Sequence, residues 1–440
     1  MATRDSEAKA RARWAALETR RDEHEPVMRL ANMLFVTMIR SGARCVRVRS
    51  DAAPTIQQCG ATGWSPLDGF EPPLRIAEPL VWRLKQMADI AVEKMLAFDA
   101  TTHIVVGARP DQTHDYDVHF SRCEKGSVIV IAKAPTEPSE PYDAGRVRRA
   151  WILLSHAEDA PAREETLALV REATTLVGDG DVMRERVLLR AASICFGSGL
   201  YAEALSLLGA ALSLTTNVRR RAHAERTIGA IHEDHWRLAE AKTWYARALA
   251  TADGAPAPLL DAVSPALDRA DVAMKEEDFE TAERWLARGE SMIADVFGET
   301  SAAFVGTRAR RVELMRLRGE ASAAERVAAE ALEAAQRFAL SEDADALRYE
   351  LAELVHARGD AAAAVAHLRD LLRAPTRYPP RARAHVLLAR SLRALGKEAE
   401  ASAALRAAST LVGGILPSDH PLSLEIELEL AQLDATSPYR

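Results

Sequence analysis

The sequence predicts a mainly α-helical protein, in which a small α+β domain precedes an α-solenoid of helix pairs. Three features predict this class: a helix signature repeated through the C-terminal part, strand-like alternation in the N-terminal part, and a proline-rich stretch between them. We expect a charged helical leader over 1–25, the α+β domain over 26–134, a linker over 135–145 and the solenoid over 146–436.

The repeated signature is a small, a large and a small residue at positions i, i+4 and i+7, first seen at Ala204, Leu208 and Ala211. These offsets lie on one helical face, so such a helix can dock closely against the helix before it. The signature returns at Ala241/Tyr245/Ala248, Ala282/Leu286/Gly289, Ala324/Ala328/Ala331, Ala364/Leu368/Leu371 and Ala401/Leu405/Ala408. The first members are 37, 41, 42, 40 and 37 residues apart. A period in this range is typical of a solenoid of helix pairs.

The N-terminal region begins with helical patterns. Residues 1–25 are rich in Ala, Arg and Glu and are expected to form a charged helix. Pro26 fits the first position of the next helix, which is strongly apolar. Methionines at 28, 33 and 38 could form a soft binding face, but core packing is the favoured interpretation.

Strand-like periodicity follows this helix. Cys45–Arg49 alternates as a strand does, and a glycine-rich loop with Gly60, Gly63 and Gly69 is expected next. A long amphipathic helix is expected from about Pro73. Three further strand-like runs are His103–Val106, Tyr116–Phe120 and Ser127–Ala132. Mixed helices and strands, with strands at the end, predict a small α+β domain.

Four segments of this region carry a resemblance to a known domain. They are the run from Met38 to Val48, the helix Leu80–Ala91 with its Arg-Leu-Lys-Gln-Met-Ala core, the strand Asp117–Ser121 and the strand that starts at Gly126. Together they resemble the N-terminal domain of type IV pilus and type II secretion ATPases. The resemblance implies an interaction domain related to a secretion-type assembly.

The departures from that family limit what the resemblance implies. Arg44 and Cys45 replace the family's Ser-Asp pair, and His119 replaces its strand arginine. A P-loop needs Gly-x-x-x-x-Gly-Lys-Ser/Thr to hold phosphates, but the Gly396-Lys397 pair is followed by glutamate. We therefore expect the interaction domain without the ATPase.

Residues 133–142, with three prolines, break both periodicities and predict a linker. Residues 146–178 are expected to form an atypical first helix pair, and 420–431 a closing helix. The first helix of each repeat has a small residue near its middle, with Val312 as the exception: Ala192, Gly229, Ala270, Ala352 and Ala389. Glycines expected at left-handed turns between helices are Gly199, Gly319, Gly359 and Gly396. This pattern resembles the tetratricopeptide family in a form of about 40 residues per repeat.

The tetratricopeptide resemblance implies that the first helices line a groove that holds an extended peptide or a partner helix. The register implies that these groove residues are Arg186, His223, Arg226, Glu233, Asp271, Glu313, Arg316, Tyr349, Glu353, His356, Arg383, Arg390 and Arg393. Arg383, Arg390 and Arg393 gather at the C-terminal end and could clamp an acidic segment or a terminal carboxylate. The alternative is a solvated helix face in an arginine-rich protein.

Composition and motifs argue against several other classes. A net charge of −7 disfavours nucleic-acid binding, and the apolar run Leu30–Ile39 is too short to cross a membrane. His232 and His235 lie three residues apart without a zinc-protease pattern, so packing and surface roles are favoured over metal binding. The sequence shows no catalytic constellation and predicts no cofactor and no metal. We expect a cytoplasmic protein without membrane insertion.

The predicted function is that of a non-enzymatic adaptor or scaffold for protein–protein interaction. Its groove would bind a protein or peptide, and its N-terminal domain would meet a secretion- or type IV pilus-type assembly. An alternative is a regulator that senses a ligand or peptide and changes the curvature of the solenoid. An enzyme with an unrecognised site is a third hypothesis.

Overall fold

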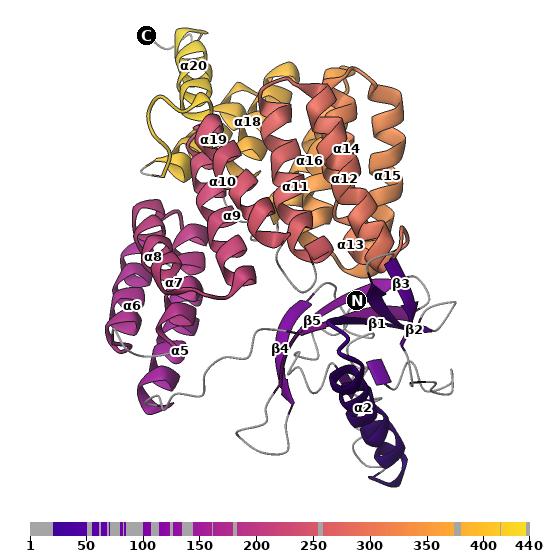
Figure 1. Ribbon diagram of the computed structural model, residues 1–440. Coiled ribbons are helices and arrows are strands. Elements are labelled where there is room, and N and C mark those ends of the chain that lie inside the picture. Colours follow the sequence, from indigo (N-terminus) through magenta and orange to yellow (C-terminus); the bar gives the residue numbers. More distant parts are fainter. Residues whose placement is uncertain are drawn as a thin grey trace.

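The computed structural model contains an antiparallel sheet that lies between one helix and a long array of helix pairs (Figure 1). It describes residues 21–50, 55–60, 63–67, 70, 80–81, 83–84, 100–106, 114–123, 126–133, 144–160, 162–178, 183–253, 258–373, 380–413 and 415–436. Residues 1–20 of the leader predicted over 1–25, residues 135–143 of the linker predicted over 135–145, and most of the helix predicted from Pro73 lie outside these residues.

Within the described residues, the N-terminal part contains six strands, the helix α2 and helical residues at 80–81 and 83–84. The helix and the strands are α2 (Arg21–Ser41), β1 (Cys45–Arg49), β2 (Thr55–Gly60), β3 (Gly63–Pro66), β4 (Ala100–Val106), β5 (His114–Cys123) and β6 (Gly126–Lys133). The strand order is β3-β2-β1-β6-β5-β4, and every neighbouring pair is antiparallel. The central pair is in register from Cys45 opposite Ala132 to Arg49 opposite Val128.

Both faces of the central strands are buried. On β1, Val46 and Val48 pack with α2, whereas Cys45 lies on the opposite face. The continuous apolar run of β6 divides in the same way, because successive side chains of a strand point to opposite faces. Ile129 and Ile131 therefore contact α2, while the neighbouring valines contact the solenoid. An apolar run without alternation is the expected sequence of a strand covered on both sides.

The structure confirms the four strand-like runs and corrects three expectations. The region around Gly60 and Gly63 is not a loop, since it forms the β2–β3 hairpin. Pro26 does not start the helix, which begins five residues earlier at Arg21. Met38 is buried, but Met33 is 56% exposed, because it lies on the side of α2 that faces away from the sheet. The core-packing interpretation is therefore wrong for Met33.

The helices that follow are arranged as consecutive antiparallel pairs, the architecture that the tetratricopeptide resemblance implies. The pairs are α5 (Ala144–Asp159) with α6 (Arg163–Thr175), α7 (Arg184–Gly197) with α8 (Tyr201–Leu214), α9 (Val218–Asp234) with α10 (Leu238–Ala252), α11 (Pro258–Lys275) with α12 (Phe279–Phe297), α14 (Arg308–Leu317) with α15 (Ala321–Phe338), α16 (Ser341–Ala357) with α17 (Ala361–Arg373), and α18 (Pro380–Ala394) with α19 (Glu398–Val412). The short α13 (Ala302–Val305) and the last helix α20 (Pro421–Thr436) complete the order. None of the described helices is long and apolar enough to cross a membrane.

The turns between the two helices of a pair use left-handed backbone. The four glycines predicted for this role have φ between +70° and +92°. Trp236 and Glu277 occupy the same position in the α9–α10 and α11–α12 turns, with φ of 59° and 60°. These two non-glycine residues therefore have a backbone conformation that favours glycine. The sequence pattern did not predict it at either position.

The sheet packs directly against the solenoid, and the two parts share a hydrophobic core. Side chains on the second face of β1, β5 and β6 join a cluster with α11, α12 and α13. Arg47 of β1 donates from Nη1 to the carbonyl oxygens of Asp295 (2.6 Å) and Val296 (3.0 Å), near the end of α12. Its guanidinium also stacks on Trp64 at 4.2 Å. A cation at the C-terminal end of a helix satisfies carbonyl groups that lack helical partners.

The C-terminal end of the solenoid folds back onto its early repeats. Ile415, between α19 and α20, lies so close to the α7–α8 turn that a Cβ at Gly199 would be 3.0 Å from its Cγ2. His420 packs edge-on against Trp236 of the α9–α10 turn, with ring centroids 5.9 Å apart. The segment before α20 therefore closes one end of the inner surface.

Candidate partner-binding surface

The first helices of successive pairs form the inner surface of the solenoid. Consecutive members α7, α9, α11, α14, α16 and α18 contact one another along the array. Charged side chains project from each of them toward the next. Any partner held in the groove would meet this surface, so its charges decide what it can bind.

An ionic ladder joins α7, α9, α11, α14 and α16 in turn, and a further ion pair joins α18 to α20. Its pairs, about one repeat apart in sequence, are Arg220–Glu185 (2.9 Å), Arg226–Asp268 (2.5 Å), Lys275–Glu233 (2.6 Å), Arg310–Asp271 (2.8 Å), Arg316–Glu350 (2.9 Å) and Arg393–Glu429 (2.6 Å). Most of the acidic partners are nearly buried, whereas the basic partners keep some exposure. Removing the base from such a pair leaves a buried carboxylate, which is strongly unfavourable.

The ladder accounts for several of the residues that the sequence assigned to the groove. Arg226 and Arg316 are ladder members. His356 continues it, because its Nδ1 lies 3.0 Å from Ser391 Oγ of the next first helix. Tyr349 instead donates its hydroxyl to Glu353 on its own helix at 2.7 Å. Arg186 lies near the start of α7, at the far end of the inner surface.

Arg390 and Arg393 already hold an acidic segment, which is the protein's own closing helix. Arg390 pairs with Glu425 (2.6 Å) and Glu429 (2.9 Å) of α20, and Arg393 pairs with Glu429 (2.6 Å). The acid-binding property predicted from sequence is thus used within the chain. A partner could reach these two arginines only by competing with α20.

Arg383, the third arginine of the predicted clamp, differs from these two. Within the described part of the chain it forms no hydrogen bond and no ion pair, and it is not fully buried. It lines a small pocket of about 20 Å³ between α9, α11, α18 and the segment before α20. The other lining residues are Glu233, Asp234, Trp236, Lys275, Leu416, His420 and Leu422.

Two acidic and two basic side chains line this pocket together with His420. Burial, with a smaller contribution from the nearby Arg383 and Lys275 cations, lowers the pKa of His420 to about 4. The imidazole is therefore neutral at pH 7. Asp234 is occupied by the Tyr201 hydroxyl at 2.9 Å, and Lys275 by Glu233. Arg383 forms no ion pair among the described residues, but it opposes the rise that burial causes in the pKa of Asp234, which lines the same pocket.

Further along the inner surface, carboxylates outnumber the cations near them. Burial raises the pKa of Glu350 to about 8, the Glu313 carboxylate adds to this, and Arg316 opposes it. Burial likewise raises the pKa of Asp271 to about 7, against the attraction of Arg310. These groups bind protons near neutral pH, so the charge of the inner surface changes with pH.

The histidine pair considered for metal binding has other roles in the structure. The ring of His235 lies 2.8 Å from the carbonyl oxygen of Ile231 and packs edge-on against Tyr201. Among the described residues, no group of three or more His, Cys, Asp or Glu side chains could hold a metal ion. We therefore propose no metal site at His232 and His235.

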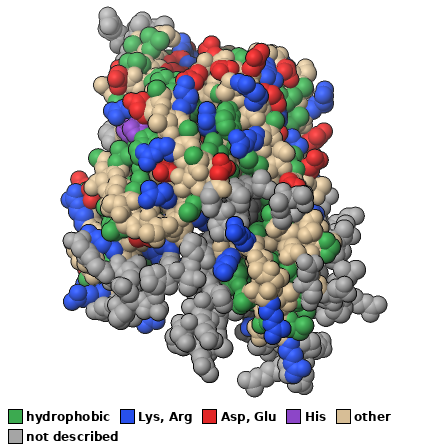
Figure 2. Space-filling model, in the orientation of Figure 1, with side chains coloured by type: hydrophobic (Ala, Val, Ile, Leu, Met, Phe, Trp, Pro, Cys, Tyr) green, Lys and Arg blue, Asp and Glu red, His purple; other side chains and the backbone are tan. Residues whose placement is uncertain are grey.

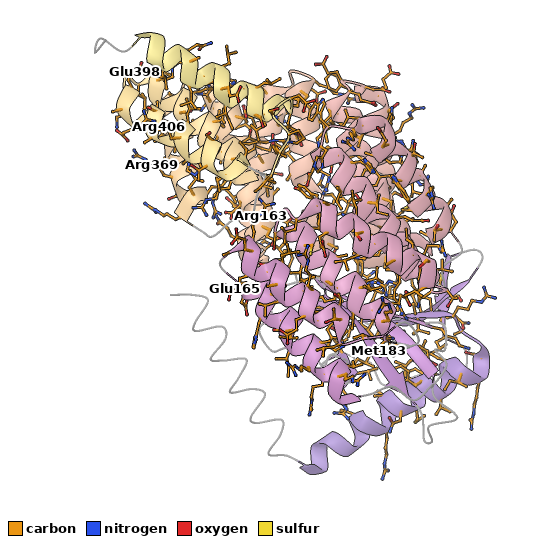
Figure 3. The ribbon with its side chains drawn as sticks, turned by 90° about the vertical axis from the view of Figure 1, so that its left-hand side faces the viewer. Arg163, Glu165, Met183, Arg369, Glu398 and Arg406 are labelled. Carbon is orange, nitrogen blue, oxygen red and sulfur yellow. The ribbon has the colours of Figure 1, made fainter. Side chains whose placement is uncertain are left out.

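Two arginines on the outer surface can be compared with Arg383. Figure 3 shows Arg369 on α17 and Arg406 on α19 at the outside of the C-terminal repeats. Arg369 pairs with Glu400 at 2.7 Å, and both side chains are about half exposed. Arg406 is exposed, and within the described residues it has no ion pair. Arg406 is therefore a matched outer control for Arg383.

Sequence reasoning missed Lys275, Trp236 and His420, which complete the pocket. Lys275 and Trp236 come from neighbouring repeats and contact each other, whereas His420 reaches them only because the end of the solenoid folds back. It also missed the ladder, although a signal was present. Acidic and basic residues recur on the first helices about one repeat apart, as in Arg226 and Asp268.

The fold and this surface define a helical-repeat solenoid with a docked α+β domain and a charged inner surface. No family model matches the chain, and no curated protein matches it. Among solved structures, the chain is similar to a tetratricopeptide repeat protein from Parabacteroides merdae, at 17% identity over 65% of this chain and 98% of that one, with a TM-score of 0.44.

The chain is also similar to yeast Tom70, at 15% identity over 68% of this chain and 59% of that one, with a TM-score of 0.43. A third similar structure is a signal transduction ATPase with a tetratricopeptide repeat sensor from Pyrococcus horikoshii. That identity is 13% over 68% of this chain and 45% of that one, with a TM-score of 0.42. At these identities and TM-scores the likenesses carry no functional conclusion. The repeat architecture rests on the helix pairs of this chain itself.

Proposed function

We propose that this protein is a scaffold for protein–protein interaction whose inner surface binds an extended peptide segment. One observation carries the proposal: Arg383 has no ion pair among the described residues and lines a pocket, although the neighbouring inner cations are paired. The cavity of about 20 Å³ beside Arg383 holds about one water-sized group, so a peptide would place a carboxylate oxygen there and lie outside it. The group it takes is a carboxylate, which Arg383 binds.

The binding mode follows from the polar lining of the surface. Backbone groups of an extended peptide need hydrogen-bond partners, which the partly exposed basic members of the ladder supply. The carboxylate on Arg383 fixes the register of the peptide. No covalent step is involved.

The test uses two pools of fluorescein-labelled nonapeptides that are randomised at all positions except the centre, which is Glu in one pool and Gln in the other. Fluorescence anisotropy should show about tenfold tighter binding of the Glu pool by the full-length protein. Arg383→Gln should remove the preference, and the outer control Arg406→Gln should keep it. Equal binding of both pools by the unmodified protein would remove Arg383 from the proposal. Binding of neither pool would count against the scaffold itself.

A peptide-sensing regulator is the second candidate, and the position of the pocket favours it. Its walls come from α9 and from the segment before α20, so an occupant touches both ends of the folded-back array. Binding there would change how firmly the end is closed. Small-angle scattering with and without the Glu pool separates the two: a regulator changes its radius of gyration, and a rigid scaffold does not.

The proposed link to a secretion or pilus-type assembly rests on the short motifs of the N-terminal domain. It predicts that the partner of this domain belongs to such an assembly. Capture with the whole chain is the appropriate test, because one face of the sheet is covered by the solenoid.

A further inference from the structure

Two helices at opposite ends of the molecule carry exposed apolar faces (Figure 1). Ten large apolar side chains are exposed among the described residues, and five of them lie on α2 and α20. The other five are distributed over separate elements. Scattered apolar residues are normal on a protein surface, whereas groups on one helix face indicate an interaction site.

The outer face of α20 is apolar with an acidic edge. Leu424 is 51% exposed and Leu428 is 61% exposed, and Ala431 continues the same stripe. Glu427, on this face, is exposed and forms no ion pair within the described residues. The opposite side of α20 buries Leu422 and Ile426 against the preceding repeat. Helices that end a solenoid normally present a polar outer face, so an apolar one predicts a partner.

The outer face of α2 is apolar with a basic edge. Met33 is 56% exposed, Val36 is 44% exposed and Ile39 is 40% exposed. Arg40 is exposed on the same stripe and has no ion pair within the described part of the chain. The other side of the helix buries Leu34 and Phe35 against the sheet. The α2 face is therefore the electrostatic complement of the α20 face.

We propose that the α20 face of one copy of this protein binds the α2 face of a second copy. The stripes run from residue 424 to 431 and from 33 to 40, which are equal lengths of helix of about 10 Å. With the two helices antiparallel, Leu428 packs on Val36, Ala431 on Met33, and Glu427 of one copy lies within one helical turn of Arg40 of the other. Figure 2 shows green and red side chains at the upper end, where α20 lies, and green and blue at the lower end, where α2 lies.

Charge disfavours the symmetric alternatives. An antiparallel α20–α20 contact would place Glu427 of each copy opposite the other, and a parallel α2–α2 contact would do the same with Arg40. Like charges at an interface oppose binding. A contact between two different faces of the same molecule is heterologous and leaves one face of each kind free. Copies therefore add head to tail.

The contact is expected to be weak and reversible. A single helix packed on another buries less than the roughly 1,000 Å² of a stable interface. Association should thus depend on concentration in the micromolar range or above, and should weaken as salt screens the Glu427–Arg40 attraction. At low concentration the protein is a monomer.

Sedimentation velocity on the full-length protein, from about 1 to about 200 µM, tests the proposal. The weight-average mass of the unmodified protein should rise with concentration. Leu428→Glu and Met33→Glu should each remain monomeric alone. An equimolar mixture should form 1:1 dimers and nothing larger, because each variant keeps one intact face. Leu214→Glu, at a 48% exposed position on α8, is the matched control and should associate normally.

Exchanging the charges of Glu427 and Arg40 provides a second test. Glu427→Arg and Arg40→Glu should each weaken association about tenfold, and the protein carrying both should regain it. Circular dichroism confirms that each variant is folded, as exposed positions allow. A protein that stays monomeric at the highest concentration contradicts the proposal. So does self-association of Met33→Glu or of Leu428→Glu alone, which would indicate a symmetric contact.

Discussion

At the scale of single residues, Glu350 shows how the inner surface balances its charges. It is nearly buried on α16, receives a hydrogen bond from Arg316 at 2.9 Å, and has the Glu313 and Glu353 carboxylates nearby. Burial is the main reason that its pKa is raised from 4.5 to about 8. One cation does not compensate for burial beside two further acids.

The pH dependence of stability follows from this shift. Between the unfolded pKa near 4.5 and the folded pKa near 8, the folded state holds a proton that the unfolded state has released. The free energy of unfolding contributed by Glu350 therefore falls as the pH rises through this range. We expect the urea midpoint to be higher at about pH 5.5 than at about pH 8.5, with a smaller difference in Glu350→Gln.

Glu398→Gln is the control for this prediction, since Glu398 is exposed at the start of α19 (Figure 3). It should leave the difference between the two pH values unchanged. An equal pH dependence in the unmodified protein and in Glu350→Gln would show that Glu350 does not hold the extra proton.

At the scale of elements, α20 is attached to the array by charge as much as by apolar contact. Arg390 and Arg393 hold Glu425 and Glu429, while Leu422 and Ile426 enter the core. The ladder that joins the inner helices therefore continues into the closing helix. This helix and the segment before it also supply part of the lining of the pocket at Arg383.

Reversing the charge at both Arg390 and Arg393 should weaken the attachment of α20 to the array. Arg390→Glu with Arg393→Glu replaces attraction by repulsion, which we expect to cost about 1–2 kcal/mol because these pairs are partly exposed. Amide hydrogen exchange in α20 should then be roughly tenfold faster. Adding Glu425→Arg and Glu429→Arg restores opposite charges and should restore protection. Unchanged exchange in the double variant would show that apolar packing alone holds α20.

At the scale of the whole molecule, the α+β domain and the solenoid form one folding unit. The second face of the sheet is buried on α11, α12 and α13, and Arg47 connects β1 to the end of α12. The Ser121 hydroxyl also accepts a hydrogen bond from the backbone N–H of Ala303 at 3.2 Å. The two parts should therefore unfold together.

Arg47→Ala should make the two parts unfold in separate transitions. The substitution removes the two hydrogen bonds from Arg47 to α12, an expected loss of about 3 kcal/mol at the interface, together with its contacts to Gln57 and Trp64 within the sheet. Urea unfolding followed by tryptophan fluorescence and by circular dichroism should give one transition in the unmodified protein and two in the variant. Arg44→Ala, at an exposed position beside β1, should behave as the unmodified protein. A single coincident transition in Arg47→Ala would show that the apolar contacts suffice.

The sequence alone determined the repeat architecture, since the signature from Ala204 to Ala408 depends on contacts between helices that are neighbours in the chain. It also located the four strand-like runs, because alternation is local. It indicated that Arg390 and Arg393 bind acids, but not that the acids belong to α20.

Only the tertiary structure decided which distant surfaces meet. The docking of β1 on α12, the pocket that combines Arg383 with Trp236 and the exposure of Met33 depend on the path of the whole array. The apolar run of β6 indicated that both faces are covered, but not by what. Local periodicity fixes which side of an element is buried, whereas the partner of that side is set by long-range packing that no short segment encodes.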